Sequence, residues 1–370
     1  AGALAMLTGF IWVANEGAWS AADWAAPVAY SGDSLQILGW ITAAAEGDYS
    51  VFGLNFVRRL GAPYEANWND YPMYEKPFTI LLGQLARRLG AGAAANIGML
   101  LVHMLATFSF YLSVRWFRWN RCWCGVAAMV FGLFYYIATR GSGHLLLALV
   151  YTLPPALLAT WLLTASRRIW RYSPTWCLCV WVSFWMGISC PYYLNMYLQL
   201  LLLGMLMQGL TRRDADNLWA GVHCLVSSAA GFLLIHSGLL AMRLLAGANH
   251  HALERKFSEV EIYGLRPLEL LMPYPGHQFE PFSSMGEYYR AHAAYSQGEM
   301  FSPYLGVLTG AMLFGLVWAG IRAMARNRND GVPLPFWQTG WVAAYSVIGG
   351  GNACLAYFGI KMFRASNRYS

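Results

Sequence analysis

The sequence predicts an all-α polytopic membrane protein with about nine transmembrane segments. The chain of 370 residues is 58% hydrophobic and only 12% charged, whereas a soluble domain averages about 25% charged residues. Apolar runs close to the ~20 residues needed to cross a bilayer recur along it. Backbone groups in lipid must be hydrogen-bonded internally, so these runs are predicted to be helices. Weak period-2 alternation argues against a β-barrel.

The predicted helices follow the apolar runs in chain order. They lie at 1–13, 92–114, 123–138, 144–165, 176–189, 193–210, 217–246, 303–321 and 336–359. Residues 1–13 are too short to cross a bilayer, and the last residues stop without a closing helix, so both ends are expected to be truncated. Pro154 and Pro155 predict a kink within 144–165. Residues 1–370 are interpreted as one transmembrane module.

Charge sorting predicts which loops share a side of the membrane. Arginines gather in alternate loops, at 115–121, 166–175, 211–216 and 322–335. Fifteen of the eighteen acidic residues lie instead at or before Glu75 or within 247–302. The positive-inside rule therefore places the four basic loops in the cytoplasm. A first outer loop, 14–91, and a second outer segment, 247–302, face the periplasm or cell exterior, as in a bacterial cytoplasmic (inner) membrane. Membrane lipids are expected partners, and the scattered basic clusters argue against nucleic acid.

The first outer loop carries two short apolar stretches, 35–45 and 78–89. Neither is long enough to span a bilayer, and the apolar residues of each fall on one helical face, as in interfacial helices. Asp33 precedes the first stretch, where the alternative to a chemical role is a helix N-cap.

Two further acids of this loop, Asp70 and Glu75, are candidate catalytic residues beside Asp33. The alternative for Asp70 is an Asx-turn before Pro72. The alternative for Glu75 is a solvated surface pair with Lys76. A divalent metal at Asp33 and Asp70 stays open, and no cofactor is otherwise assigned. The seven cysteines lie in or beside apolar segments, so they are interpreted as small buried hydrophobes and no metal ligands are assigned.

Cations and tyrosines gather at the predicted outer ends of the helices. His144 is a candidate catalytic residue, with a helix N-terminal histidine as the alternative. The candidate phosphate-binding residues are Arg140, Tyr192, Tyr193, Arg266, His277, Arg364 and Arg368. Cations beside carboxylates suit the binding of a lipid-linked phosphate next to an acid or base. The alternative for each cation is interfacial anchoring. His103, His223 and His236 are assigned to helices, where they pack or hydrogen-bond between helices.

Several segments together resemble the polytopic glycosyltransferases of the GT-C class. They are GDSLQILGW (32–40), GAPYEANWNDYP (61–72), RGSGHLLLALVYTLPP (140–155), GISCPYY (187–193), EIYGLRPLELLMPYPGH (261–277) and GGGNACLAYFGIKMFRASNRYS (349–370). The resemblance implies an acidic residue in the first outer loop, here Asp33 with Asp70 or Glu75. It also implies a sugar donor linked to polyprenyl phosphate. The chain departs from the class in having no adjacent pair of acids.

Three functions follow as hypotheses. The first is a membrane glycosyltransferase that moves a sugar from a polyprenyl-phosphate donor to an acceptor on the outer face. The second is a transporter or flippase of a lipid-linked saccharide, which predicts charged or broken helices at mid-membrane. The third is a non-catalytic scaffold within an envelope-polysaccharide assembly, which would add envelope assembly partners to the lipid-linked donor.

Overall fold

The computed structural model describes residues 1–60, 63–70, 73–165, 169–211, 215–250, 255–293, 299–326 and 332–369. The chain forms two compact units, Ala1–His251 and Ala252–Ser370. Both consist mainly of α-helices, which confirms the predicted all-α class. The expected basic loops at 166–175, 211–216 and 322–335 lie partly outside the described residues.

The first unit holds most of the apolar helices. Its elements are α1 (Gly2–Glu16), α2 (Ala21–Ala25), α3 (Asp33–Glu46), β1 (Phe56–Val57), β2 (Ala66–Asn67), α4 (Lys76–Leu89), α5 (Ala91–Arg115), α6 (Arg121–Gly132), α7 (Tyr135–Arg140), η1 (Ser142–His144), η2 (Val150–Thr152), α8 (Leu153–Ala165), α9 (Pro174–Ile188), α10 (Pro191–Thr211), α11 (Ala215–Ile235) and α12 (Ser237–Ala246). Helix starts follow capping chemistry: the side chains of Asn120 and Ser173 accept backbone N–H groups in the first turns of α6 and α9. The antiparallel pair β1–β2 joins α3 to α4.

The second unit is smaller. Its elements are α13 (Phe257–Ile262), η3 (Pro267–Leu270), α14 (Glu280–His292), α15 (Gly306–Ala325), α16 (Leu334–Ser346), α17 (Gly351–Tyr357) and η5 (Ser366–Tyr369). Leu265 and Val347 form an isolated parallel bridge, in which the Leu265 N–H donates to the Ser346 carbonyl oxygen over 2.9 Å. The Ser366 hydroxyl donates to the same oxygen over 2.7 Å. These bonds hold the segment that follows α13 and the C-terminal segment against the end of α16.

Five helical stretches in the described part of the chain are long and apolar enough to cross a membrane. They are Ala91–Arg115, Arg121–Arg140, Pro191–Leu210, Ala215–Ile235 and Gly306–Ala325. Three shorter apolar helices accompany them, at Val150–Ala165, Pro174–Ile188 and Ser237–Ala246. The protein therefore has the helices of a membrane protein, and the count of nine spans is not confirmed.

Several predicted helices are interrupted. The helix expected at 144–165 begins only at Val150, and Pro154 and Pro155 lie in the first turn of α8 instead of kinking a longer helix. Proline suits this position because the first N–H groups of a helix have no intrahelical acceptor. The stretch 217–246 breaks at His236, between α11 and α12, so the assignment of His236 to a helix is wrong. Residues 336–359 break between α16 and α17, where Gly349 has a φ of 73°.

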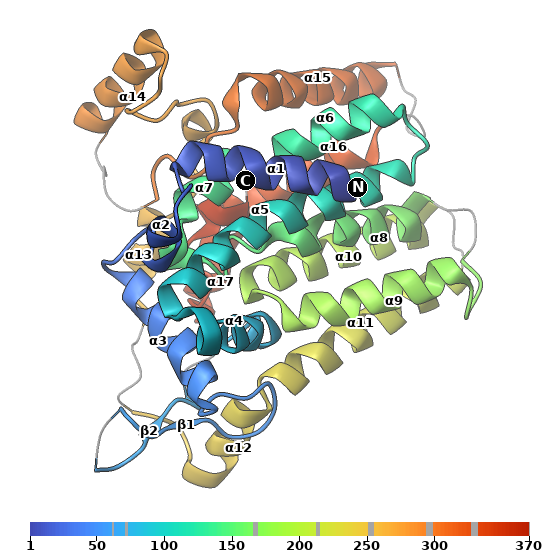
Figure 1. The fold of residues 1–370 in the computed structure, drawn as a ribbon. Helices are drawn as coiled ribbons and strands as arrows, with labels where there is room; N and C mark the ends of the chain where they lie inside the picture. The colour runs from blue at the N-terminus through green and yellow to red at the C-terminus, as the bar shows by residue number, and fades with distance from the viewer. Residues whose placement is uncertain are drawn as a thin grey trace. The chain divides into compact units, whose positions relative to one another are not determined.

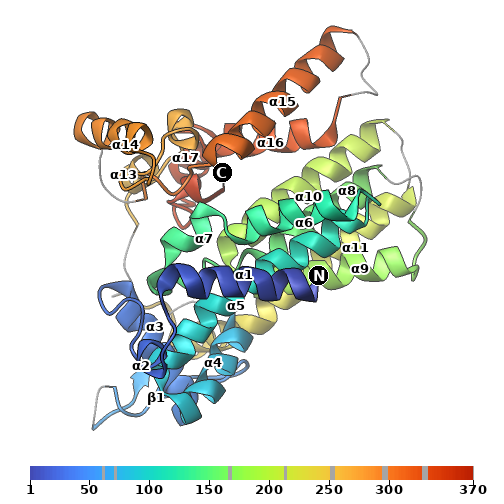
Figure 2. The same ribbon diagram turned by 45° about the horizontal axis from the view of Figure 1, so that its top comes forward.

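The helices of the first unit run back and forth between two ends of a bundle. Figure 1 shows α5, α6, α8, α9, α10 and α11 side by side, and α3, α4 and the β1–β2 pair gathered at the end opposite the α5–α6 connection. The 45° view agrees (Figure 2). Arg115 and Arg121 lie at the α5–α6 connection. The basic end and the acidic first loop therefore occupy opposite ends of this unit, as the charge sorting predicts.

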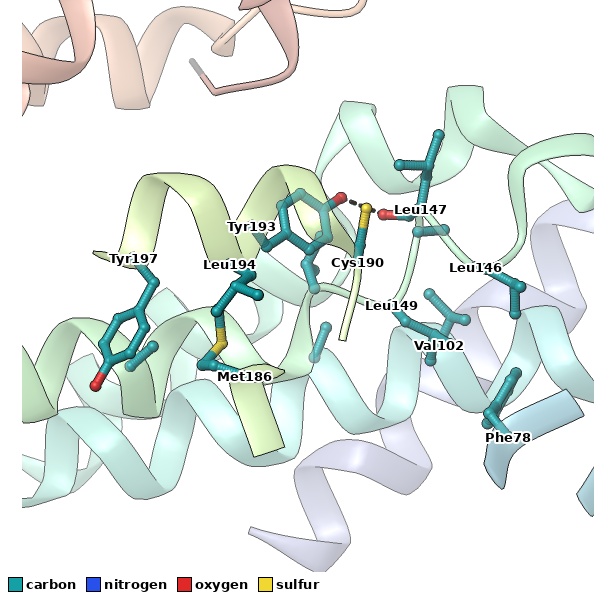
Figure 3. Packing of buried hydrophobic residues seen from close by; sticks show 14 of the residues in the cluster. Phe78, Val102, Leu146, Leu147, Leu149, Met186, Cys190, Tyr193, Leu194 and Tyr197 are labelled. Carbon is teal, nitrogen blue, oxygen red and sulfur yellow. Dashed lines mark hydrogen bonds between the residues drawn. The ribbon is translucent and has the colours of Figure 1, made fainter. Parts of the chain in front are cut away.

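The core of the first unit contains a buried segment that is not α-helical. Residues 145–149 lie between η1 and η2, and all five are at most 4% exposed. Figure 3 shows Leu146 and Leu149 packed near Val102 of α5, while Tyr193 of α10 reaches the Leu147 carbonyl oxygen. The Tyr193 hydroxyl donates a hydrogen bond to that oxygen. A buried carbonyl outside a helix would otherwise lack a donor, so this contact stabilises the segment.

Helices α9 and α11 approach each other closely through small residues. A Cβ on Gly187 would lie 2.2 Å from the Ser228 carbonyl oxygen, and one on Gly231 would lie 2.3 Å from the Phe184 carbonyl oxygen. The Ser228 hydroxyl donates to the Ser183 carbonyl oxygen over 3.0 Å. Small residues and interhelical hydrogen bonds are the usual basis of helix association in membranes.

Replacing Gly231 tests this contact. We expect Gly231→Ala to destabilise the protein by about 1–3 kcal/mol, because the added methyl group must displace the backbone of α9. The control is Gly209→Ala in α10, where a Cβ would meet nothing within 4 Å and the change should be neutral or stabilising by up to about 1 kcal/mol. Thermal unfolding of the detergent-purified variants measures the difference. Equal stability of the two variants would contradict the close approach.

Candidate functional site

Asp33 begins α3 at an unusual turn. Gly32 precedes it with a φ of 53°, and no side chain caps the helix. The interpretation of Asp33 as an N-cap is therefore wrong, since it is the first helical residue. The turn is closed by Ser34, whose hydroxyl accepts from the Ser31 N–H over 2.9 Å. The Asp33 carboxylate still lies in the first turn, where the helix dipole favours a negative charge.

Asp33 contacts His144 from the turn after α7. The His144 Nε2 atom is 3.4 Å from the Asp33 Oδ2 atom, and the two side chains are 36% and 65% exposed. Gly143 lies against the start of α3, since its Cβ position is 3.4 Å from the Ser34 nitrogen. The sequence predicts that both residues lie at the outer face of the membrane. The structure shows that their side chains are in contact. An exposed carboxylate beside an imidazole can accept, hold or transfer a proton.

Arg140, four residues before His144, packs against one of two buried, hydrogen-bonded tyrosines. The Arg140 guanidinium lies 4.5 Å from the centre of the Tyr136 ring, and Arg140 is only 4% exposed. The Tyr136 and Tyr193 hydroxyl oxygens are 3.0 Å apart. Tyr193 is buried and its hydroxyl donates to the Leu147 carbonyl oxygen, so its predicted contact with a phosphate stays a prediction. Tyr192, beside it, is half-buried.

Asp70 lies apart from this pair, next to α12. Its Oδ1 atom is 4.0 Å from the Arg243 Nε atom. The preceding Asn69 accepts from the Asn55 N–H over 2.6 Å, which fixes the loop. The predicted turn before Pro72 lies outside the described residues. Asp33 and Asp70 thus have different cationic neighbours, and the described residues contain no group of three His, Cys, Asp or Glu side chains that could hold a metal ion.

Glu75 is buried inside the first unit. It is 2% exposed, has a φ of 53°, and its Oε1 atom has no hydrogen-bond partner among the described residues. Its N–H donates to the Ile188 carbonyl oxygen over 3.3 Å. Burial raises the pKa of the Glu75 carboxyl to about 8, against the weaker opposing effect of a hydrogen bond with Ser189. Glu75 therefore holds a proton at neutral pH.

The interpretation of Glu75 and Lys76 as a solvated surface pair is wrong. Lys76 is 5% exposed, and burial lowers the pKa of its ammonium group. The Lys76 Nζ atom is 5.9 Å from the centre of the Tyr49 ring. The signal available in the sequence is that these charges lie in PMYEKPF, a short stretch of apolar and aromatic residues.

The predicted phosphate-binding cations of the second unit contact carboxylates. Arg266 Nη1 is 3.2 Å from Glu269 Oε1, and Arg364 Nη1 is 3.0 Å from Glu259 Oε2. Arg368 Nε is 3.1 Å and 3.0 Å from the two carboxylate oxygens of Glu299. His277 accepts from the Phe279 N–H through its Nδ1 atom over 3.0 Å. A phosphate at these arginines would have to compete with the carboxylates, so their binding role stays a prediction.

The histidines within α5 and α11 have packing roles. His103 Nδ1 is 2.6 Å from the Gly132 carbonyl oxygen, at the C-terminal end of α6. This is the interhelical hydrogen bond that the sequence predicted for it. His223 packs edge-on against Trp176, with ring centres 5.5 Å apart. Both side chains therefore contribute to packing between helices.

No protein-family model, curated protein or solved structure matches this chain. The resemblance to the GT-C class therefore stays a prediction that rests on the sequence segments alone.

Glu75→Gln tests the buried acid. In the unfolded chain the carboxyl ionises near its ordinary pKa of 4.5, whereas in the folded protein it stays protonated up to about pH 8. Wild-type stability should therefore fall as pH rises from about 4.5 to 8, and no such loss should occur below that window. Glutamine cannot ionise, so we expect the variant to be more stable by a few kcal/mol at pH 8 and equal near pH 4.5.

The measurement is chemical or thermal unfolding of detergent-purified protein at a series of pH values. Glu65→Gln is the control, because Glu65 is exposed and its loss should leave the wild-type profile unchanged. If Glu75→Gln follows the wild-type profile between pH 4.5 and 8, Glu75 is ionised in the folded protein.

Proposed function

We propose that the protein is a membrane glycosyltransferase that transfers a sugar from a polyprenyl-phosphate donor to an acceptor. The observation that supports this most directly is the contact of Asp33 with His144. Both side chains are accessible, and they come from elements that pack together, α3 and η1. In this Asp33–His144 dyad, Asp33 belongs to the first outer loop, and both residues lie in segments that resemble the GT-C class, 32–40 and 140–155.

In the proposed reaction, Asp33 takes the proton of the acceptor hydroxyl, and His144 orients the carboxylate and shares the proton. The acceptor oxygen then bonds to the anomeric carbon of the donor sugar, and the polyprenyl phosphate leaves with the electrons of the broken glycosidic bond. Positive charge near the leaving oxygen lowers the barrier. Arg140 is the nearest such charge along the chain, four residues before His144.

We further propose about nine membrane-spanning segments in a bacterial cytoplasmic membrane, with the dyad on the periplasmic or extracellular face. The support is the separation of the basic end of the helix bundle from the acidic first loop. The short apolar helices α8 and α9, beside the five long stretches, would supply additional crossings in a locally thin or protein-lined region.

Transport of a lipid-linked saccharide is the second candidate function. The observation in its favour is the buried segment 145–149, which is not helical although it lies within the bundle. Broken helices at such depth are typical of transporters. Translocation of a fluorescent polyprenyl-phosphate sugar across vesicles containing the purified protein, without transfer to any acceptor, would favour this alternative.

Asp33→Asn tests the transferase. We expect transfer to fall by about 10²–10⁴-fold, because asparagine keeps the shape and removes the proton acceptor. The assay follows labelled sugars carried on polyprenyl phosphate, offered as a panel to the full chain in membranes. Glu16→Gln is the control, since Glu16 is exposed at the end of α1 and should be silent. Full activity of Asp33→Asn, His144→Gln and Asp70→Asn together would exclude the proposed reaction.

Cysteine labelling tests the orientation. The exposed Cys122, Cys177 and Cys354 are first replaced by serine. Single cysteines are then introduced at Trp119, which is 63% exposed at the basic end, and at Tyr64, which is 80% exposed in the first outer loop. An impermeant maleimide applied to intact cells should label Tyr64→Cys and reach Trp119→Cys only after permeabilisation. The opposite pattern would invert the proposed topology.

A further inference from the structure

An apolar groove lies between α14 and the first half of α15, within the second unit. Its volume is about 290 Å³, close to the lower end of the ~300–1,000 Å³ that small-molecule sites occupy. Phe282 and Met285 of α14 line it, together with Leu271 of the segment after η3. Of the described residues in its lining, none is charged, and Tyr304 has the only polar side chain. The proposed transfer reaction uses none of these residues.

One face of α15 forms the longest side of the groove. Gly306, Gly310, Ala311 and Phe314 line it, and their spacing places them on the same side of the helix. A Cβ on Gly310 would lie 3.2 Å from the Leu271 Cδ2 atom, so the small residue leaves room for Leu271 beside the helix. The eight-residue step from Gly306 to Phe314 extends about 12 Å along the helix axis.

The groove is continuous with the apolar outer surface of α15. This helix is one of the five that are long and apolar enough to cross a membrane, and only 11% of its apolar window is buried inside the protein. Val307 and Phe314 line the groove and are themselves 66% and 61% exposed. In a membrane, lipid chains cover such a surface, because they are as apolar as the side chains that they meet. The groove is therefore a hollow in the surface that contacts lipid.

Helix α14 indicates how deep in the membrane this hollow lies. Its 13 residues span about 20 Å, too short for a hydrocarbon core of ~30 Å. Glu287 and Arg290 are exposed on it, and so is Met285. A short helix with both charged and apolar exposed residues suits the membrane surface. The groove then begins near that surface and runs along α15 into one leaflet, whose hydrocarbon layer is ~15 Å thick.

We propose that the groove binds one acyl chain of a bilayer phospholipid, from the leaflet at the N-terminal end of α15. Left empty, the groove would deprive its lining atoms of dispersion contacts, and a flexible hydrocarbon chain restores them. A 12 Å length of protein helix, ~10 Å wide, has a volume of roughly 900 Å³. This is about three times the volume of the groove, so the groove cannot enclose a helix of a second copy.

This proposal does not rest on sugar transfer. The groove belongs to the second unit, whereas the Asp33–His144 dyad belongs to the first. The test below measures bound lipid and not activity, so failure of either proposal leaves the other standing.

Photo-crosslinking tests the acyl-chain site. The full chain is reconstituted in phosphatidylcholine nanodiscs that contain a small fraction of phosphatidylcholine with a diazirine on one acyl chain. After irradiation, the lipid adducts are mapped by peptide mass spectrometry. Leu308 and Met312 are internal controls, because they are exposed on the same part of α15 but do not line the groove. We expect Val307 and Phe314 to carry at least about threefold more adduct, since a chain in the groove makes many contacts at once.

A substitution that fills the groove provides the second measurement. Ala311→Trp adds a large side chain within the lining and should lower the adducts on Phe314 and Met285 at least about threefold, because the contacts of the chain are lost together. Ala319→Trp is the matched control: Ala319 is exposed on the same helix and outside the lining, so the adduct pattern should persist. If Ala311→Trp does not fold, Ala311→Leu replaces it, with a smaller decrease in the same direction.

Four outcomes would overturn the proposal. One is equal labelling of the groove residues and of Leu308 and Met312. Another is an unchanged adduct pattern in a folded Ala311→Trp or Ala311→Leu variant. Loss of the groove adducts when polyprenyl phosphate is added at a small fraction of the phospholipid concentration would assign the groove to that chain instead. Cross-links between two copies of the protein through the groove residues, made with a bifunctional reagent, would assign it to self-association.

Discussion

The fold of the first unit depends on hydrogen bonds that side chains make to backbone groups where its helices stop. An apolar interior offers no water to an exposed carbonyl or N–H group, so each interruption needs a partner from another element. His103 meets the Gly132 carbonyl oxygen at the end of α6, and Tyr193 meets the Leu147 carbonyl oxygen in the buried segment. Asn96 binds three backbone groups at and after the end of α2, among them the Val28 N–H over 3.0 Å.

These interruptions also create the candidate site. A continuous helix through 135–165 would carry Arg140 and His144 inside a regular bundle, spaced one turn apart along the same face. The break after α7 instead exposes His144 next to Asp33 and leaves Arg140 buried against Tyr136. The non-helical segment and the dyad are thus consequences of one local feature, and this is why the structure supports both a catalytic and a transport hypothesis.

Four charged residues of the first outer loop occupy three different environments. Asp33 is exposed beside His144. Asp70 is half-buried beside Arg243. Glu75 and Lys76, although adjacent in sequence, are both buried and have different neighbours: Glu75 lies near Ser189, and Lys76 lies over the Tyr49 ring. Desolvation favours the neutral form of both buried groups, so their chemistry differs from that of the exposed pair.

The sequence by itself determined the fold class, the main apolar helices and the separation of basic from acidic loops, because hydrophobic length and charge are local properties of the chain. It also placed the helices at 35–45 and 78–89 to within a few residues of α3 and α4. It could not show the breaks at His236 or before Val150, since apolar residues continue through both. The burial of Glu75 and Lys76 and the contact of Asp33 with His144 were decided only by tertiary structure. A side chain's solvent exposure and partners depend on elements far away in sequence, which no local pattern encodes.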